Sequence, residues 1–169
     1  MTEKQSFFGR ITQLARANIN ALIDQAEDPQ KMLDQLVRDY TNSIAEAEKA
    51  IAQTIGNLRL AEQDHAADLE EARDWGNKAL AASNKAEEMR TAGNAAEAQR
   101  FDDLAKIAIT KQIAAEQEAR DAEPMIASQN EVVDKLKTGL TQMRTKLEEL
   151  KSKRDQLVSD FVQTPLESP

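Results

Sequence analysis

The amino-acid sequence predicts an all-α protein, a long antiparallel coiled-coil helical hairpin preceded by a short amphipathic helix. Three observations predict this fold class. Aromatic residues make up only 4% of the 169 residues, with five glycines and four prolines. Charged residues make up 31%, which leaves too few large apolar side chains for a thick globular core but suits helices that bury a narrow stripe. Apolar residues also recur at helical spacing over two long segments, 29–90 and 95–161.

Composition and charge exclude several classes of function. The absence of cysteine removes disulfides and thiolate chemistry and fits a reducing cytoplasm. No run approaches the ~18 apolar residues of a spanning helix, and we expect no signal peptide. The net charge of −8 disfavours nucleic-acid binding because phosphates would repel most of the molecule. Residues 1–23 nevertheless carry +2 and residues 24–169 carry −10, so a small cationic segment precedes an acidic body.

Three breaks set the domain organisation. Asp28 and Pro29 form a helix start, with an acidic cap before a proline at the first helical position. Gly93 and Asn94 form the one compact turn signal in the middle of the chain. Pro165 ends the last helical pattern. The predicted parts are an amphipathic membrane-binding helix (1–26), the hairpin (29–163, with arms at about 29–90 and 95–161 and a tip at 91–94) and a tail (164–169).

The two long segments carry matching coiled-coil seams, with apolar steps that alternate between three and four. Folding the chain at Gly93 pairs residues whose numbers sum to about 185. We expect a slip of phase at His65, because the seam would step by four both from Ala61 and on to Leu69. We also expect Phe161 to be the last seam residue of the second arm. The paired seam consists of Leu33, Val37, Ile44, Ile51, Leu58, Ile126, Val133, Leu140 and Leu147.

The N-terminal segment has the pattern of an interfacial helix. At 100° per residue its aromatic and aliphatic side chains gather on one half of the helical wheel, and polar residues occupy or border the other half. Such a helix inserts its apolar face into the acyl boundary while arginines pair with anionic headgroups. The residues predicted to bind the membrane are Phe7, Phe8, Arg10, Ile11, Leu14, Arg16, Ile19, Leu22 and Ile23.

The same apolar face could instead pack on a hydrophobic groove of this hairpin or of a neighbouring one. A free helix of this length gains little stability in water from its own propensity. We therefore expect residues 6–26 to be largely disordered in the absence of lipid or a partner.

Catalytic and metal-binding patterns are weak. Glu62 and His65 have the spacing of one carboxylate–imidazole pair of a di-iron bundle, but the chain has no second histidine. We find no glycine-rich phosphate loop and no nucleophile turn. We therefore expect no enzymatic activity, no cofactor and no metal site, and we expect Trp75 to be a packing residue near the tip.

A specific resemblance enters at the junction between the first two predicted helices. The run from Asn18 to Leu33, NINALIDQAEDPQKML, closely resembles this junction in phage-shock protein A and the vesicle-inducing protein in plastids. These proteins are relatives of the ESCRT-III membrane-remodelling proteins. The segment from Phe8 to Ile11 resembles the amphipathic start of the family, and the predicted tip fits its coiled-coil arms. The likeness covers essentially the whole chain.

The resemblance implies a peripheral protein on the inner, cytoplasmic face of the cell membrane that acts in the envelope stress response. Its implied partners are anionic membrane lipids and other copies of the chain, and it would stabilise or remodel membranes as a scaffold. Some members also hold a transcriptional activator inactive until stress recruits them to lipid. Family members usually continue beyond the hairpin with further helices, whereas this chain ends at Pro169. We therefore expect lipid contact to be retained more readily than stable polymerisation.

Two alternatives to the scaffold stay open. The hairpin could be a regulatory module that sequesters a transcriptional activator or a membrane stress protein, with the first helix serving only to release it at lipid. It could also be a plain coiled-coil spacer. A saturable complex with the activator, displaced by lipid, would favour the regulatory module.

Overall fold

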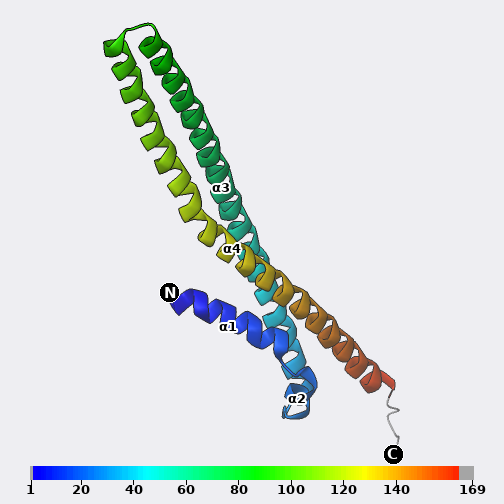
Figure 1. Ribbon diagram of the computed structural model, residues 1–169. Coiled ribbons are helices and arrows are strands. Elements are labelled where there is room, and N and C mark those ends of the chain that lie inside the picture. The colour runs from blue at the N-terminus through cyan, green and yellow to red at the C-terminus, as the bar shows by residue number, and fades with distance from the viewer. Residues whose placement is uncertain (1, 164–169) are drawn as a thin grey trace, which may run out of the picture. The chain divides into compact units, whose positions relative to one another are not determined.

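The predicted all-α fold class is confirmed. The computed structural model describes the backbone of residues 2–163 and the side chains of residues 7–162, and this part of the chain contains helices and no strand. The predicted tail, 164–169, lies outside the described residues. The four helices are α1 (Thr2–Arg16), α2 (Ile19–Asp24), α3 (Pro29–Thr91) and α4 (Ala95–Gln163), and the two long ones pack against each other as a hairpin (Figure 1).

Short polar caps start the helices. Asn18 precedes α2, and its side-chain oxygen accepts a hydrogen bond from the Ala21 backbone N–H at 3.1 Å. Asp28 caps α3 in the same way through Lys31 N–H at 3.2 Å, with Pro29 at the first helical position. Asn94 caps α4 by accepting from Glu97 N–H at 3.2 Å.

The tip is closed by a glycine in the left-handed region. Gly93 has φ +77°, and its N–H donates to Arg90 C=O at 3.1 Å. Asn94 N–H donates to Met89 C=O at 2.8 Å, so the last carbonyls of α3 find partners in a Schellman motif. A residue with a Cβ is strained at this φ, which explains why the turn depends on glycine here.

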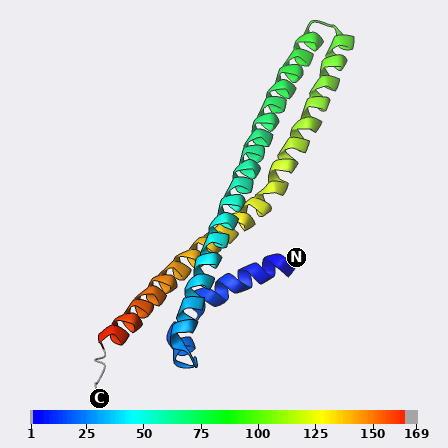
Figure 2. The ribbon, with the colours of Figure 1, turned by 180° about the vertical axis from the view of Figure 1, so that it is seen from behind.

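The chain forms two compact units. Unit 1 contains α1, α2, α3 up to Ile55 and α4 from Glu131 onward, and unit 2 contains residues 56–130. In unit 2 the two helices run side by side and join at the tip in both ribbon views (Figure 1 and Figure 2).

The core of unit 1 is made of large side chains. Among the seam residues predicted there, Leu33, Ile44, Ile51, Val133 and Leu140 are buried, and Val37 and Leu147 are partly buried against the same cluster. Phe161, the last predicted seam residue, is 84% exposed, so this prediction is wrong. In the register of unit 1, Phe161 lies opposite the first turn of α3, near Lys31, and the first buried residue of α3 is Leu33.

Unit 2 has a different seam. Leu58 is its one buried residue larger than alanine between 56 and 130, all of which are described, and Ile126 is only partly buried. Large aliphatic residues of this unit, including Leu80, Ile107 and Ile113, remain exposed. The buried alanines of the seam are Ala72, Ala79, Ala86, Ala98, Ala105, Ala108, Ala115 and Ala119.

The predicted slip of phase at His65 is wrong. Asp68 is partly buried and Ala72 is buried, whereas Leu69 is 48% exposed. The seam therefore steps by three from His65 to Asp68 and then by four to Ala72, and the heptad continues without an inserted residue. Leu69 lies about 100° around the helix from this seam position, so it faces away from α4. A short polar side chain is tolerated in its place because it stays partly in contact with solvent.

Pairs across the hairpin give its register. His65 Nε2 lies 3.5 Å from Glu123 Oε1 in unit 2, and the residue numbers sum to 188. Arg144 Nη2 lies 2.7 Å from Glu48 Oε1 in unit 1, where the numbers sum to 192. These values lie three and seven above the predicted 185, so the register in unit 1 differs from the prediction by a full heptad. Trp75 is half-buried beside two lysine ammonium groups, Lys78 at 4.4 Å and Lys111 at 5.1 Å from the ring centre.

Candidate functional site

The candidate site is the N-terminal pair of helices, α1 and α2, within unit 1. The structure shows both as helices packed on α3 and α4, which differs from the expected disorder of residues 6–26. Packing of an apolar face supplies the stability that an isolated helix of this length lacks. The apolar face that the sequence assigns to lipid is thus turned toward the chain's own hairpin.

Burial divides the predicted membrane-binding residues into three groups. Ile11 and Ile19 are 4% and 2% exposed and belong to the core of unit 1. Leu22 is 38% exposed, and both arginines are exposed. The remaining apolar members are partly buried against the core, namely Phe7, Phe8, Leu14 and Ile23.

The two phenylalanine rings lie together at the N-terminal end of this contact. Their centres are 6.0 Å apart and their planes meet at 69°, the edge-to-face arrangement that aromatic pairs favour. Arg10 and Arg16 lie about 100° and 140° from Ile11 around the helix, on opposite sides of it. Their charges therefore remain in contact with solvent while the apolar face is covered.

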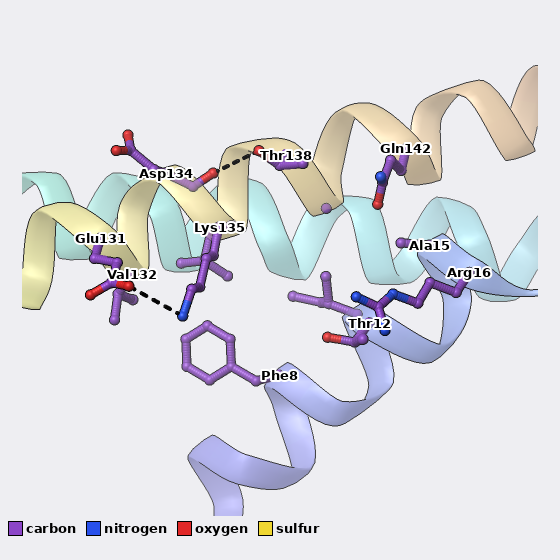
Figure 3. A pocket seen from close by; sticks show the side chains of 13 residues that line it. Phe8, Thr12, Ala15, Arg16, Glu131, Val132, Asp134, Lys135, Thr138 and Gln142 are labelled. Carbon is purple, nitrogen blue, oxygen red and sulfur yellow. Dashed lines mark hydrogen bonds and ion pairs between the residues drawn. The ribbon is translucent and has the colours of Figure 1, made fainter.

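An open groove of about 680 Å³ lies between α1 and α4. Its apolar lining includes Phe8 and Ile11 from α1 and Val132 and Leu136 from α4. Figure 3 shows Lys135 extending from α4 toward Phe8, and the lysine ammonium lies 3.6 Å from Glu131 Oε1. The groove is thus apolar at its base with paired charges at its edge.

Two hydrogen bonds join the C-terminal end of α1 to the hairpin. The Tyr40 hydroxyl, from α3, donates to the Leu14 carbonyl at 2.5 Å. The Lys146 ammonium, from α4, donates to the Ala17 carbonyl at 2.7 Å. Burial, and secondarily the nearby Glu149 carboxylate, raise the pKa of Tyr40 to about 12. Its hydroxyl therefore stays a donor throughout the neutral range.

Two contact residues of this site were not predicted. Gly139 of α4 is buried, and a Cβ built on it would lie 2.7 Å from Ile11 Cγ2. Leu36 of α3 is also buried in the core of unit 1, beside the predicted stripe. A glycine inside a long heptad, between Leu136 and Leu140, is the signal that could have revealed the first contact.

Metal and transmembrane sites receive no support from the described residues. Among the described side chains, residues 7–162, no three histidine, aspartate or glutamate side chains gather closely enough to hold a metal ion. His65 Nε2 lies 3.5 Å from Glu123 Oε1, and His65 belongs to no such cluster among the described residues. No helix in the described part of the chain is long and apolar enough to cross a membrane.

The fold and site define a class of protein, a coiled-coil helical hairpin with an amphipathic N-terminal helix. The model of the PspA/IM30 family matches residues 6–160, and the chain belongs to this family.

Curated relatives agree with this assignment. The chain is 29% identical over 150 residues to the membrane-associated protein Vipp1 of Synechocystis sp., covering 89% of this chain and 51% of that protein. It is 29% identical over 154 residues to a phage shock protein A homolog of Deinococcus radiodurans, covering 91% and 63%. It is 26% identical over 150 residues to protein LiaH of Bacillus subtilis, covering 89% and 60%. The chain thus spans between half and two thirds of the length of these relatives.

Proposed function

We propose that this chain is a non-enzymatic, peripheral membrane-binding scaffold of the envelope stress response. It binds anionic lipid on the inner face of the cell membrane through α1 and α2, and it self-associates through its hairpin. The observation that carries the proposal is the two-sided character of residues 7–23, with one apolar face and arginines on either side of it. Relatives named as membrane-associated proteins and phage shock protein A homologs support it.

The charge distribution favours an anionic surface. The body of the chain is acidic, so it is repelled by anionic lipid except where the N-terminal segment carries its +2. A basic side chain near an anionic surface contributes about 1 kcal/mol, and this attraction decays within a Debye length. Binding should therefore orient the chain with α1 and α2 against the membrane.

Exposed aliphatic side chains of unit 2 also support the self-association part of the proposal. Leu80, Ile107 and Ile113 of unit 2 are exposed and have aliphatic side chains suited to another protein surface. The regulatory alternative, in which the hairpin sequesters a transcriptional activator, would use the same kind of surface. Added liposomes distinguish self-association from the regulatory alternative, because only a complex between the hairpin and an activator should be displaced by lipid.

The test is liposome co-sedimentation of the double variant Arg10→Glu/Arg16→Glu. We expect it to lose on the order of 100-fold in affinity for anionic liposomes at low salt, because two attractions become repulsions. The matched control is Arg38→Glu/Lys49→Glu, two exposed cations on α3 that give the same change in net charge. We expect the control to bind much more tightly than the α1 double variant.

The apolar part of the binding is tested separately by salt. Phe8→Asp should weaken binding at every salt concentration, because burial of apolar area is not screened. Equal losses in the α1 variant and the matched control would mean that overall charge governs binding. Unchanged binding by both α1 variants would show that another surface contacts the lipid, and the proposal would be wrong.

A further inference from the structure

We infer that the hairpin holds α1 in an autoinhibitory contact, so that membrane insertion requires α1 to detach from α3 and α4. This inference rests on the proposed function, because it concerns the helix assigned there to lipid. The side chains that would enter the acyl region include Ile11 and Ile19, and both are buried in the core of unit 1. One face of a helix cannot be covered by its own hairpin and by lipid at the same time.

The first element of the contact is steric. Ile11 reaches the backbone of α4 at Gly139, where any Cβ would lie only 2.7 Å from Ile11 Cγ2. Glycine is a poor helix former in the interior of a helix such as α4. At this position it makes room for the isoleucine, and this close approach buries Ile11 almost completely.

The second element is polar and comes from both arms. The last carbonyls of a helix lack partners within that helix. Tyr40 of α3 donates to Leu14 C=O, and Lys146 of α4 donates to Ala17 C=O just beyond the end of α1. A cation at the C-terminal end of a helix also interacts favourably with the helix dipole. The hairpin therefore supplies hydrogen-bond donors to the C-terminal carbonyl groups of α1 while α1 is docked. Both hydrogen bonds are lost when α1 leaves the hairpin.

The third element is what the docked position leaves outside. Arg10 and Arg16 stay exposed while the apolar face is covered. The docked protein can therefore meet an anionic surface by charge but cannot insert. When only a fraction of molecules has the binding-competent arrangement, the apparent affinity falls by that fraction. A change in α3 or α4 that weakens the packing of α1 should therefore strengthen membrane binding, although α1 itself is unchanged.

The experiment uses the full chain with Gly139→Ala, and the matched control is Gly56→Ala. Gly56 lies within α3 and has open space around the position of an added Cβ. Both changes raise helix propensity equally, but only the first requires Ile11 to shift from its contact with Gly139. We expect Gly139→Ala to bind liposomes that contain anionic phospholipid on the order of tenfold more tightly than the parent. Gly56→Ala should bind like the parent.

Release of α1 can be followed without lipid through Tyr40, which is the only tyrosine in the chain. Its pKa is raised from 10.0 to about 12, so the neutral hydroxyl favours the docked form. This contribution is fully present below pH 10 and is lost as the pH rises through 12. Tyrosinate absorbance should therefore titrate near 12 in the parent and in Gly56→Ala. In Gly139→Ala the midpoint should move toward 10.0, the ordinary value.

A second variant covers the case in which Ile11 adjusts around the new alanine and α1 stays docked. Lys146→Met removes the hydrogen bond to Ala17 C=O without adding a group at the contact between Ile11 and Gly139. It also removes a positive charge, so tighter binding to anionic liposomes would oppose the simple effect of charge. We expect the same direction of change as in Gly139→Ala.

The possible results separate this inference from the function on which it rests. If Gly139→Ala lowers the tyrosine midpoint but binds liposomes no more tightly than Gly56→Ala, docking does not restrain binding and the inference is overturned. Unchanged binding and titration in both Gly139→Ala and Lys146→Met would overturn it as well. If the parent and every variant fail to bind liposomes, the proposed function is wrong. The packing of α1 on α3 and α4 then only stabilises the fold.

Discussion

Replacing Leu140 with aspartate is expected to lower the free energy of unfolding by about 4 kcal/mol, the largest effect that we predict for a single substitution of an aliphatic residue. Leu140 is buried in α4 among the large side chains of unit 1, including Ile44 and Met143. The aspartate would remove this apolar contact and place an unpaired carboxylate in the core. Urea titration followed by circular dichroism measures the change, with the slope checked for a single transition.

The control for this prediction is Thr141→Asp. Thr141 is the next residue of α4 and is exposed, and its hydroxyl donates only to the Lys137 carbonyl of its own helix. The same charge at this position should change stability by about 0.5 kcal/mol or less. Equal losses for the two variants would mean that Leu140 does not lie in the core of the hairpin.

Tyr40→Ala is expected to lower the free energy of unfolding by about 3–5 kcal/mol, the usual range for removal of a fully buried ring. Tyr40 is 0% exposed and lies in the core of unit 1, and its hydroxyl bonds to Leu14 C=O. Loss of the ring leaves a cavity where α1 meets α3. Thermal or urea unfolding of the variant measures this effect.

Tyr40→Phe separates the ring from the hydroxyl. It keeps the packing and removes one hydrogen bond, so it should cost only about 1 kcal/mol. A loss in Tyr40→Phe as large as that in Tyr40→Ala would show that the ring contributes little, which contradicts its full burial.

The helix ends were predictable because they depend on local chemistry. A proline after an aspartate and a glycine before an asparagine have few conformational alternatives, and the structure places helix boundaries at both. The stripe of large residues in unit 1 was equally readable, since Ile44 and Ile51 in α3, and Val133 and Leu140 in α4, lie seven residues apart and are buried.

The details of the seam were less predictable because they depend on the partner helix. Hydrophobicity alone favours Leu69 over Asp68 as a seam residue. The buried residues on either side, Leu58 and Ala72, instead hold α3 in the rotation that leaves Leu69 exposed. Phe161 satisfies the heptad within α4, yet its burial depends on how far α3 extends. The rotation of α3 and the place where it begins cannot be predicted from the hydrophobicity of single residues along one helix.

The position of α1 is a further limit of sequence reasoning. An amphipathic face indicates that a helix binds something apolar, but lipid and a coiled-coil groove present similar chemistry to it. The contact that favours the groove depends on Gly139, Tyr40 and Lys146, which lie far from α1 in the sequence. Such a combination emerges only when the chain is folded.

The alanine seam of unit 2 makes the resistance to local opening unequal along α3 and α4. Burial of an alanine removes much less apolar area from water than burial of a leucine or a tyrosine. Each turn of unit 2 is therefore held by less hydrophobic free energy than the turns of unit 1 around Leu33, Tyr40 and Met143. Segments with few large buried contacts open transiently at lower free energy than the rest of a protein. We therefore expect backbone amides of unit 2 to exchange with water faster than those of unit 1 beneath α1.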